Sequence, residues 1–198
     1  MNEIKLKGKI SNIEFSHIIN NIEYQKADLI VPKENGEHDI IPLRFKSSSN
    51  IGYVNEQQIV LDGNIRSYSQ RLDNGKNRVN IYVFTYFDPT EDLDIYDYFQ
   101  VDGRVCKLDK IRGSSKGDRF HLTLANNIIS RNNKQKLNNY LPVVCYGDWA
   151  QRASELKISD KILVKGQLHS RIYRKMDKEG NVSVRTAIEL VATSFEVL

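Results

Sequence analysis

The chain has 198 residues, 40% of them hydrophobic and 27% charged, and a formal net charge of +4. It contains no run of about 18 apolar residues that would predict a transmembrane helix. The N-terminal sequence MNEIKLKGKI also lacks the apolar core of a signal peptide. We therefore expect a cytoplasmic protein with no membrane partner.

The charge is distributed unevenly along the chain. Residues 1–92 contain 11 Lys+Arg and 13 Asp+Glu, whereas residues 93–198 contain 18 and 12. A basic second half indicates a polyanionic partner, with nucleic acid as the first candidate.

Short segments with alternating apolar residues predict β-strands in both halves of the chain. In chain order they include IKLKGKISNIEF (4–15), IIPLRF (40–45), IVLDGNIRS (59–67), FQVDGRVCKL (99–108), RFHLTLANNII (119–129), YLPVVCY (140–146), KILVKGQLHSRIY (161–173) and SVRTAIELVATSFEVL (183–198). Clusters of Gly, Asn, Asp and Ser separate them, as expected for turns.

Three landmarks recur in the same order about 100 residues apart, which indicates a duplicated unit. LKGKIS (6–11) resembles VDGRVC (101–106), and IIPLRF (40–45) resembles YLPVVC (140–145). IVLDGNIRS (59–67) resembles ILVKGQLHS (162–170). Glycines inside these strands are typical of tight bends in a small barrel.

One helix is predicted in the second unit, over WAQRASEL (149–156), with Asp148 as its cap and Gln151 as the capping-box partner. The first unit has the weaker segment SSSNIGYVNEQQ (47–58) at that place, which predicts a loop or a single turn. About five strands with a helix between the third and fourth is the order of the OB-fold. The fold class is therefore all-β: two tandem five-stranded Greek-key OB-fold barrels, with a short helix in at least the second. We expect domains at 1–90 and 98–198 with an acidic linker at 91–97.

Residue types that would support catalysis or metal binding are present but scattered. Cys106 and Cys145 lie in apolar strands without CxxC spacing, which predicts buried, reduced thiols. The four histidines show no paired spacing, and GSSKG (113–117) lacks the P-loop pattern. We expect no enzyme activity, no metal and no cofactor.

Residues Phe99–Leu198 resemble the bacterial single-stranded DNA-binding protein family. The resemblance is carried by VDGRV (101–105), FHLTLANN (120–127), YLPVVCYGDWAQRASEL (140–156) and ILVKGQLHSRIY (162–173). It implies an OB-fold that binds single-stranded DNA by stacking bases on aromatic side chains. The first unit is then a divergent second OB-fold. Its equivalents of the stacking positions are about Ile40, Lys46 and Gln70, none of them aromatic, and Tyr68 or Phe45 would substitute only in a shifted register.

The candidate site combines rings with cations, as single-stranded nucleic acid requires. The resemblance places stacking at Tyr140, Tyr146 and Tyr173. The candidate phosphate contacts are Arg131, Lys134, Lys136, Arg171, Arg174, Lys175 and Lys178. Arg171, Tyr173 and Lys175 alternate and would share one face of an extended strand, and Tyr140 and Tyr146 would share a face in the absence of a bulge.

The residues and the resemblance together predict a sequence-independent single-stranded DNA-binding protein of bacterial or phage origin. It would coat and protect strands in replication, recombination or repair. A homodimer would bring four barrels together, with replication proteins as further partners. The alternative is a primosome-like accessory protein that acts mainly through protein contacts. The sequence leaves the choice between DNA and RNA open.

Overall fold

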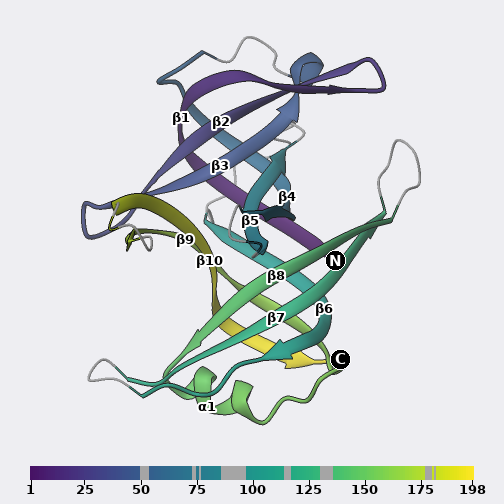
Figure 1. Cartoon of the computed structure of the whole chain (residues 1–198), viewed down its shortest axis with the longest axis vertical. Coiled ribbons are helices and arrows are strands. Elements are labelled where there is room, and N and C mark those ends of the chain that lie inside the picture. The colour runs from purple at the N-terminus through teal and green to yellow at the C-terminus, as the bar shows by residue number, and fades with distance from the viewer. Residues whose placement is uncertain are drawn as a thin grey trace.

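The computed structural model describes residues 1–49, 54–72, 75, 77–85, 97–113, 117–129, 136–176, 180 and 182–198. Ten strands account for most of them (Figure 1). The elements are β1 (Asn2–Ile19), β2 (Ile22–Pro32), β3 (His38–Lys46), η1 (Ser47–Ser49), β4 (Gln58–Arg71), β5 (Asn77–Thr85), β6 (Tyr98–Leu108), β7 (Arg119–Ile129), β8 (Lys136–Tyr146), α1 (Asp148–Ser154), β9 (Lys161–Met176) and β10 (Val182–Val197). Apart from Asp97, the expected linker 91–97 lies outside the described residues.

The first five strands close into one barrel and the last five into another, with the same connectivity. In the first, β1 pairs with β2 and β4, β2 with β3, β4 with β5, and β3 with β5 in parallel. In the second, β6 pairs with β7 and β9, β7 with β8, β9 with β10, and β8 with β10 in parallel. This five-stranded Greek-key pattern confirms the predicted tandem OB-folds.

Each barrel is filled by alternate residues of its strands, as the sequence periodicity requires. Leu6, Leu29, Leu43, Leu61 and Val83 are completely or almost completely buried in the first barrel, and Phe99, Leu124, Leu141, Val164 and Leu190 in the second. The residues between them point outward. These outward residues are the ones available to a ligand.

Two of the repeated glycines lie where neighbouring strands approach closely. A Cβ atom on Gly166 would lie 1.9 Å from the Val191 carbonyl oxygen. A Cβ on Gly103 would lie 3.0 Å from the Ala125 carbonyl oxygen. The repeated glycine landmarks thus mark bends at which a side chain would collide with backbone.

Helix α1 covers one end of the second barrel, where Ala150 and Ala153 are buried (Figure 1). Trp149 packs edge-on against Phe195 on β10, with ring centroids 5.3 Å apart. The predicted Asp148 cap is wrong: Gly147 occupies the N-cap without a side-chain hydrogen bond, and Asp148 is the first helical residue. The side-chain amide of Gln151 instead donates to the Asp118 carboxylate.

The two cysteines differ in their exposure. Cys145 is buried, as predicted, but Cys106 is exposed, so the prediction of a buried thiol there is wrong. Val105 points into the barrel, and the pairing of β6 with β7 is irregular between Val105 and Lys107, which leaves Cys106 outside the regular ladder and exposed. The sulfur of Cys106 lies 3.3 Å from the Thr123 carbonyl oxygen.

The barrels are joined through equivalent strands. β1 and β6 pair antiparallel, with Ile4 opposite Phe99, Glu3 opposite Gln100 and Lys5 opposite Tyr98. The ten strands therefore form one continuous sheet. No helix among the described residues has the length and apolar character needed to span a membrane.

Buried amide side chains reinforce this junction. The Asn2 side chain donates to the Ile65 carbonyl and to Asn126 Oδ1, each at 2.8 Å, and its Oδ1 accepts from the Ile65 amide. Asn139 on β8 accepts from the Ser67 amide on β4 at 3.0 Å. The Asn2–Ile65 bonds lie within the first barrel and orient the amide, whereas Asn126 and Asn139 belong to the second barrel, so separating the barrels would leave the Asn2–Asn126 and Ser67–Asn139 partners unsatisfied.

Candidate nucleic-acid interface

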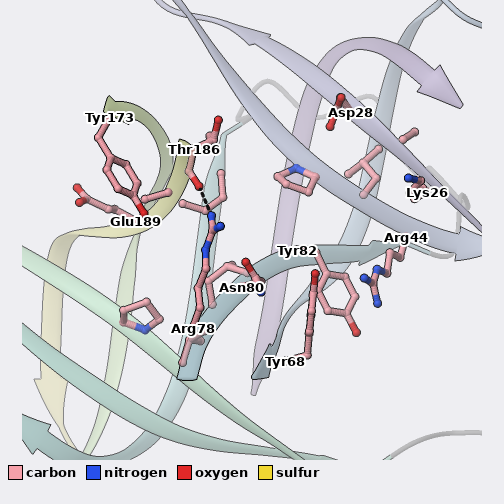
Figure 2. A pocket seen from close by; sticks show the side chains of 18 of the residues that line it. Lys26, Asp28, Arg44, Tyr68, Arg78, Asn80, Tyr82, Tyr173, Thr186 and Glu189 are labelled. Atoms are coloured by element: carbon pink, nitrogen blue, oxygen red, sulfur yellow. Dashed lines mark hydrogen bonds between the residues drawn. The ribbon is translucent and has the colours of Figure 1, made fainter. Parts of the chain in front are cut away.

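A groove of about 800 Å³ runs between the barrels over the outward faces of their strands (Figure 2). β1 to β5 contribute one wall, and β7, β8, β9 and β10 the other. Arg78 of β5 crosses it and donates from Nη2 to the Thr186 carbonyl of β10 at 3.0 Å. The groove is therefore a joint feature of both barrels.

Tyr140 and Tyr146 lie on the outer face of β8, 49% and 44% exposed. The residues between them on that face, Pro142 and Val144, line the groove. The intervening Leu141 points into the core, and the pairing of β8 with β7 is regular along this stretch, without a bulge. The backbone amide of Tyr140 donates to Ser67 Oγ of the first barrel at 2.8 Å.

Tyr173 is half-buried on β9 and lines the groove. The guanidinium carbon of Arg171 lies 5.5 Å from its ring centroid, and Arg171 Nε donates to Glu189 Oε1 at 3.2 Å. The Arg171–Glu189 pair beside the ring favours this orientation of Tyr173, which lines the groove.

The two faces of the β9–β10 hairpin differ in character. Tyr173 pairs with Arg185 and Arg171 with Ala187, whereas Arg174 pairs with Val184. The pleat therefore places Arg174 on the opposite face from Tyr173. That second face carries four exposed aliphatic side chains: Ile172, Met176, Val182 and Val184.

The remaining predicted phosphate contacts are only partly described. Lys136 is exposed at the start of β8, opposite Ile129. Arg131, Lys134 and Lys178 lie outside the described residues, as does the side chain of Lys175. Their place relative to the groove stays a prediction.

The first barrel carries a ring and cation cluster of which the sequence interpretation named only Tyr68, as a substitute in a shifted register. Tyr68 on β4 and Tyr82 on β5 have ring centroids 6.0 Å apart, at 59° to one another. The Arg44 guanidinium carbon on β3 lies 4.7 and 4.6 Å from the two centroids. All three side chains line the groove (Figure 2). The alternation in VNIYVF (79–84), with Ile81 and Val83 inward and Tyr82 outward, was the signal that could have found it.

The groove has mixed charge and includes one histidine. Lys26, Arg44 and Arg78 lie along it with Glu14, Asp28 and Glu189. Burial lowers the pKa of His121, and the nearby Arg119 lowers it further. Among the described residues, His121 Nε2 is one of four buried side-chain atoms with no hydrogen-bond partner. The groove wall therefore favours a neutral imidazole at this position.

A model of the single-strand binding protein family matches residues 97–198, just over half of the chain. The chain belongs to the single-strand binding protein family. The match covers β6 to β10, the barrel that carries Tyr140, Tyr146 and Tyr173.

Two solved structures resemble this family member over its whole length. The wild-type single-stranded DNA binding protein from Thermus aquaticus is 18% identical to this chain, with a TM-score of 0.72. The match covers 100% of this chain and 93% of the Thermus chain. A deletion mutant of the same Thermus protein is 19% identical, with a TM-score of 0.70. The match covers 100% of this chain and 94% of the mutant chain. At this identity the likeness establishes the two-barrel fold.

One curated protein also matches, the tRNA(Ile)-lysidine synthase of Clostridium tetani, at 21% identity over 192 residues. The match covers 88% of this chain, but the chain spans only 40% of that relative's length. A likeness at this low identity, over less than half of the relative, assigns no enzymatic activity to this chain.

Proposed function

We propose that the protein is a sequence-independent binder of single-stranded DNA that coats and protects strands in replication, recombination or repair. The observation that carries the proposal is the outer face of the second barrel. There, exposed Tyr140 and Tyr146 lie on the strand whose intervening residues line the groove that also holds Tyr173. Exposed rings on a sheet surface can stack on bases of any identity, because every base has a flat face.

The cations near these rings support contacts to phosphate. Arg171 lies beside Tyr173, and Lys136 is exposed on the strand of Tyr140. Arg131, Lys134, Lys175 and Lys178 belong to the proposal as phosphate contacts from the sequence. In this function the protein performs no chemistry and needs no cofactor.

The test is fluorescence anisotropy with labelled oligo-dT, the matching RNA and duplex DNA at several salt concentrations. The dT affinity should exceed the duplex affinity and fall by about 0.7 log units per log unit of salt for each phosphate neutralised. Tyr173→Ala should weaken every single-stranded sequence by roughly 5- to 150-fold, the equivalent of losing about 1–3 kcal/mol of stacking. Tyr173→Phe, which keeps the ring, is the matched control. Binding that prefers duplex DNA or ignores salt would refute the proposal.

We further propose a homodimer that presents four barrels. The aliphatic face of the β9–β10 hairpin, with Ile172, Met176, Val182 and Val184 exposed, supports self-association because water contact with such a cluster is unfavourable. Val184→Glu should convert the dimer to a monomer in multi-angle light scattering, and a wild-type protein of monomer mass would contradict the proposal.

The same aliphatic face also favours the second candidate function, a primosome-like accessory protein that acts through protein partners. In that case wild-type protein would bind oligo-dT weakly and would retain a partner protein after nuclease treatment. Val184→Glu would remove that partner, whereas Tyr173→Ala would not.

A further inference from the structure

The cluster of Arg44, Tyr68 and Tyr82 stands on the side of its strands that faces away from the barrel core. Arg44 and Tyr82 each lie between inward-pointing neighbours that fill the core: Leu43 and Phe45 beside Arg44, and Ile81 and Val83 beside Tyr82. Tyr68 is 41% exposed. The rings are therefore not needed to fill the core, and they remain accessible from the groove.

The three side chains come from three strands but meet because of strand register. β4 and β5 are antiparallel, with Arg66 opposite Tyr82 and Tyr68 opposite Asn80, so the two tyrosines are diagonal neighbours on one face. β3 runs parallel to β5 with Arg44 beside Phe84. The guanidinium consequently lies within 5 Å of both ring centroids. These backbone pairings hold the cluster in place before any ligand arrives.

The cluster lines the same groove as Tyr173 of the second barrel. Figure 2 shows Tyr173 at one end and Arg44, Tyr68 and Tyr82 at the other, with Arg78 and Asn80 between them. A ligand that stacks on Tyr173 and follows the groove therefore reaches the first barrel at this cluster.

Two tyrosine rings with a planar guanidinium against them offer flat, polarisable surfaces and one positive charge. This combination suits an unpaired nucleobase and its neighbouring phosphate, because bases stack on tyrosine and on arginine planes. A free small anion would use the charge but not the rings, and an aliphatic ligand would use neither.

We propose that Arg44, Tyr68 and Tyr82 form a second base-binding site, so that one single strand passes through the groove and contacts both barrels of the same chain. The inference rests on the proposed function, since it extends the strand path beyond the barrel that matches the family. It takes up the alternative that Tyr68 substitutes for the rings missing at Ile40, Lys46 and Gln70.

The length of the oligonucleotide separates the two sites. One OB-fold binds roughly 4–16 nucleotides, so about 8 nucleotides fill one barrel and about 30 can engage both. Anisotropy of the full chain with dT of these two lengths is compared for wild type, Tyr68→Ala and Arg44→Gln. Tyr68→Phe keeps the ring, and Lys157→Gln removes an exposed charge at residue 157, which does not line the groove.

The expected result is that Tyr68→Ala and Arg44→Gln lower the affinity for the long strand by about 5-fold or more. Binding of the short strand should change by less than about 2-fold, because the second barrel binds it unaided. Tyr68→Phe and Lys157→Gln should behave like wild type. Tyr173→Ala should weaken both lengths.

Photocrosslinking of the wild-type chain to 5-iodouracil-substituted strands gives a readout that does not depend on a variant's folding. After trypsin digestion, the long strand should label peptide 67–71, which contains Tyr68, and peptide 172–174, which contains Tyr173.

Two outcomes separate the failure of this inference from that of the proposed function. Wild-type protein that binds neither length would overturn both. A wild type that binds, with a defect in Tyr173→Ala but none in Tyr68→Ala and no label on peptide 67–71, would overturn the second site alone.

Discussion

Asp39 Oδ2 on β3 of the first barrel lies 3.0 Å from His169 Nδ1 on β9 of the second, 130 residues away in the chain. The Asp39 side chain is almost fully buried and also accepts from the Ser170 amide at 2.6 Å and from Lys33 Nζ at 2.9 Å. Burial by itself would raise the pKa of Asp39, but these hydrogen bonds outweigh it and lower the pKa below its ordinary value of 3.8. The carboxylate therefore links the barrels as a charged group.

Asp39→Asn should destabilise the protein by about 2 kcal/mol near pH 7, since the amide cannot replace the charge-assisted hydrogen bonds from His169 and Lys33. A lowered carboxyl pKa stabilises the folded state above the unfolded pKa, and this stability is lost as the pH falls through the folded value. Measured from pH 7 down to about pH 3, the difference between wild type and variant should thus shrink once the pH falls below about 4.

Urea denaturation across that pH range measures the effect. Glu34→Gln, which changes an exposed carboxylate of the same barrel, should stay within about 0.5 kcal/mol of wild type. Equal stability of Asp39→Asn and wild type at pH 7 would show that the link contributes nothing.

Asp97→Asn should have the opposite effect on stability from Asp39→Asn: it should stabilise the folded protein near pH 7. Burial raises the pKa of Asp97, and the nearby Asp39 charge raises it further. Because an acid with a raised pKa destabilises the folded state once it is ionised, removing the charge should increase the melting temperature at pH 7. The gain should disappear as the pH is lowered and the wild-type carboxyl protonates. A melting temperature that falls at pH 7 would contradict this account of Asp97.

Alanine substitutions at Gly166 and Gly103 should lower the stability of the protein by different amounts. Gly166→Ala puts a methyl group 1.9 Å from the Val191 carbonyl oxygen, whereas in Gly103→Ala the nearest atom is at 3.0 Å. We expect Gly166→Ala to cost about 3 kcal/mol and Gly103→Ala about 1 kcal/mol, the two ends of the usual range for overpacking. Guanidinium denaturation monitored by Trp149 fluorescence gives both values. The reverse order of stability would refute the steric explanation.

The two thiols should differ in reactivity. Burial raises the pKa of Cys145 to about 12, so it stays a protonated, inaccessible thiol in the folded protein. Cys106 is exposed, although partial desolvation raises the pKa of its thiol. Ellman's reagent at pH 8 should therefore titrate one thiol in native protein and two in guanidinium. Cys106→Ser should abolish the native reaction, and rapid labelling of both thiols in folded protein would exclude the buried position of Cys145.

The strand order could be predicted because its determinants are local. Alternation, the paired glycines and Pro42 and Pro142 mark corresponding places in both barrels. The helix position was predicted, but its cap was not, since the backbone at Gly147 adopts a positive φ of 55° and begins the helix one residue earlier.

The groove could not be predicted, because it depends on how the barrels are joined. Among the contacts that fix the junction are pairs more than 100 positions apart, such as Asn2 with Asn126 and Asp39 with Ser170. The search for stacking residues in the first barrel used the positions equivalent to those of the second. Those positions are Ile40, Lys46 and Gln70, so Tyr68 was named only as a substitute in a shifted register and its diagonal neighbour Tyr82 was not predicted.

The pairing of β1 with β6 sets the relative orientation of the two barrels, and with it the direction in which a bound strand would cross each of them. Gly8 corresponds to Gly103 in the repeat, so Ile4 corresponds to Phe99, and these two residues face each other. Glu3 opposite Gln100 and Lys5 opposite Tyr98 complete a local two-fold arrangement of the duplicated units. A polynucleotide has a 5′ and a 3′ end, so a strand that ran straight across both barrels, as proposed, would meet one barrel in the sense opposite to that in which it meets the other. Under the proposal, the two copies would then need aromatic contacts at non-equivalent positions, such as Tyr68 and Tyr173.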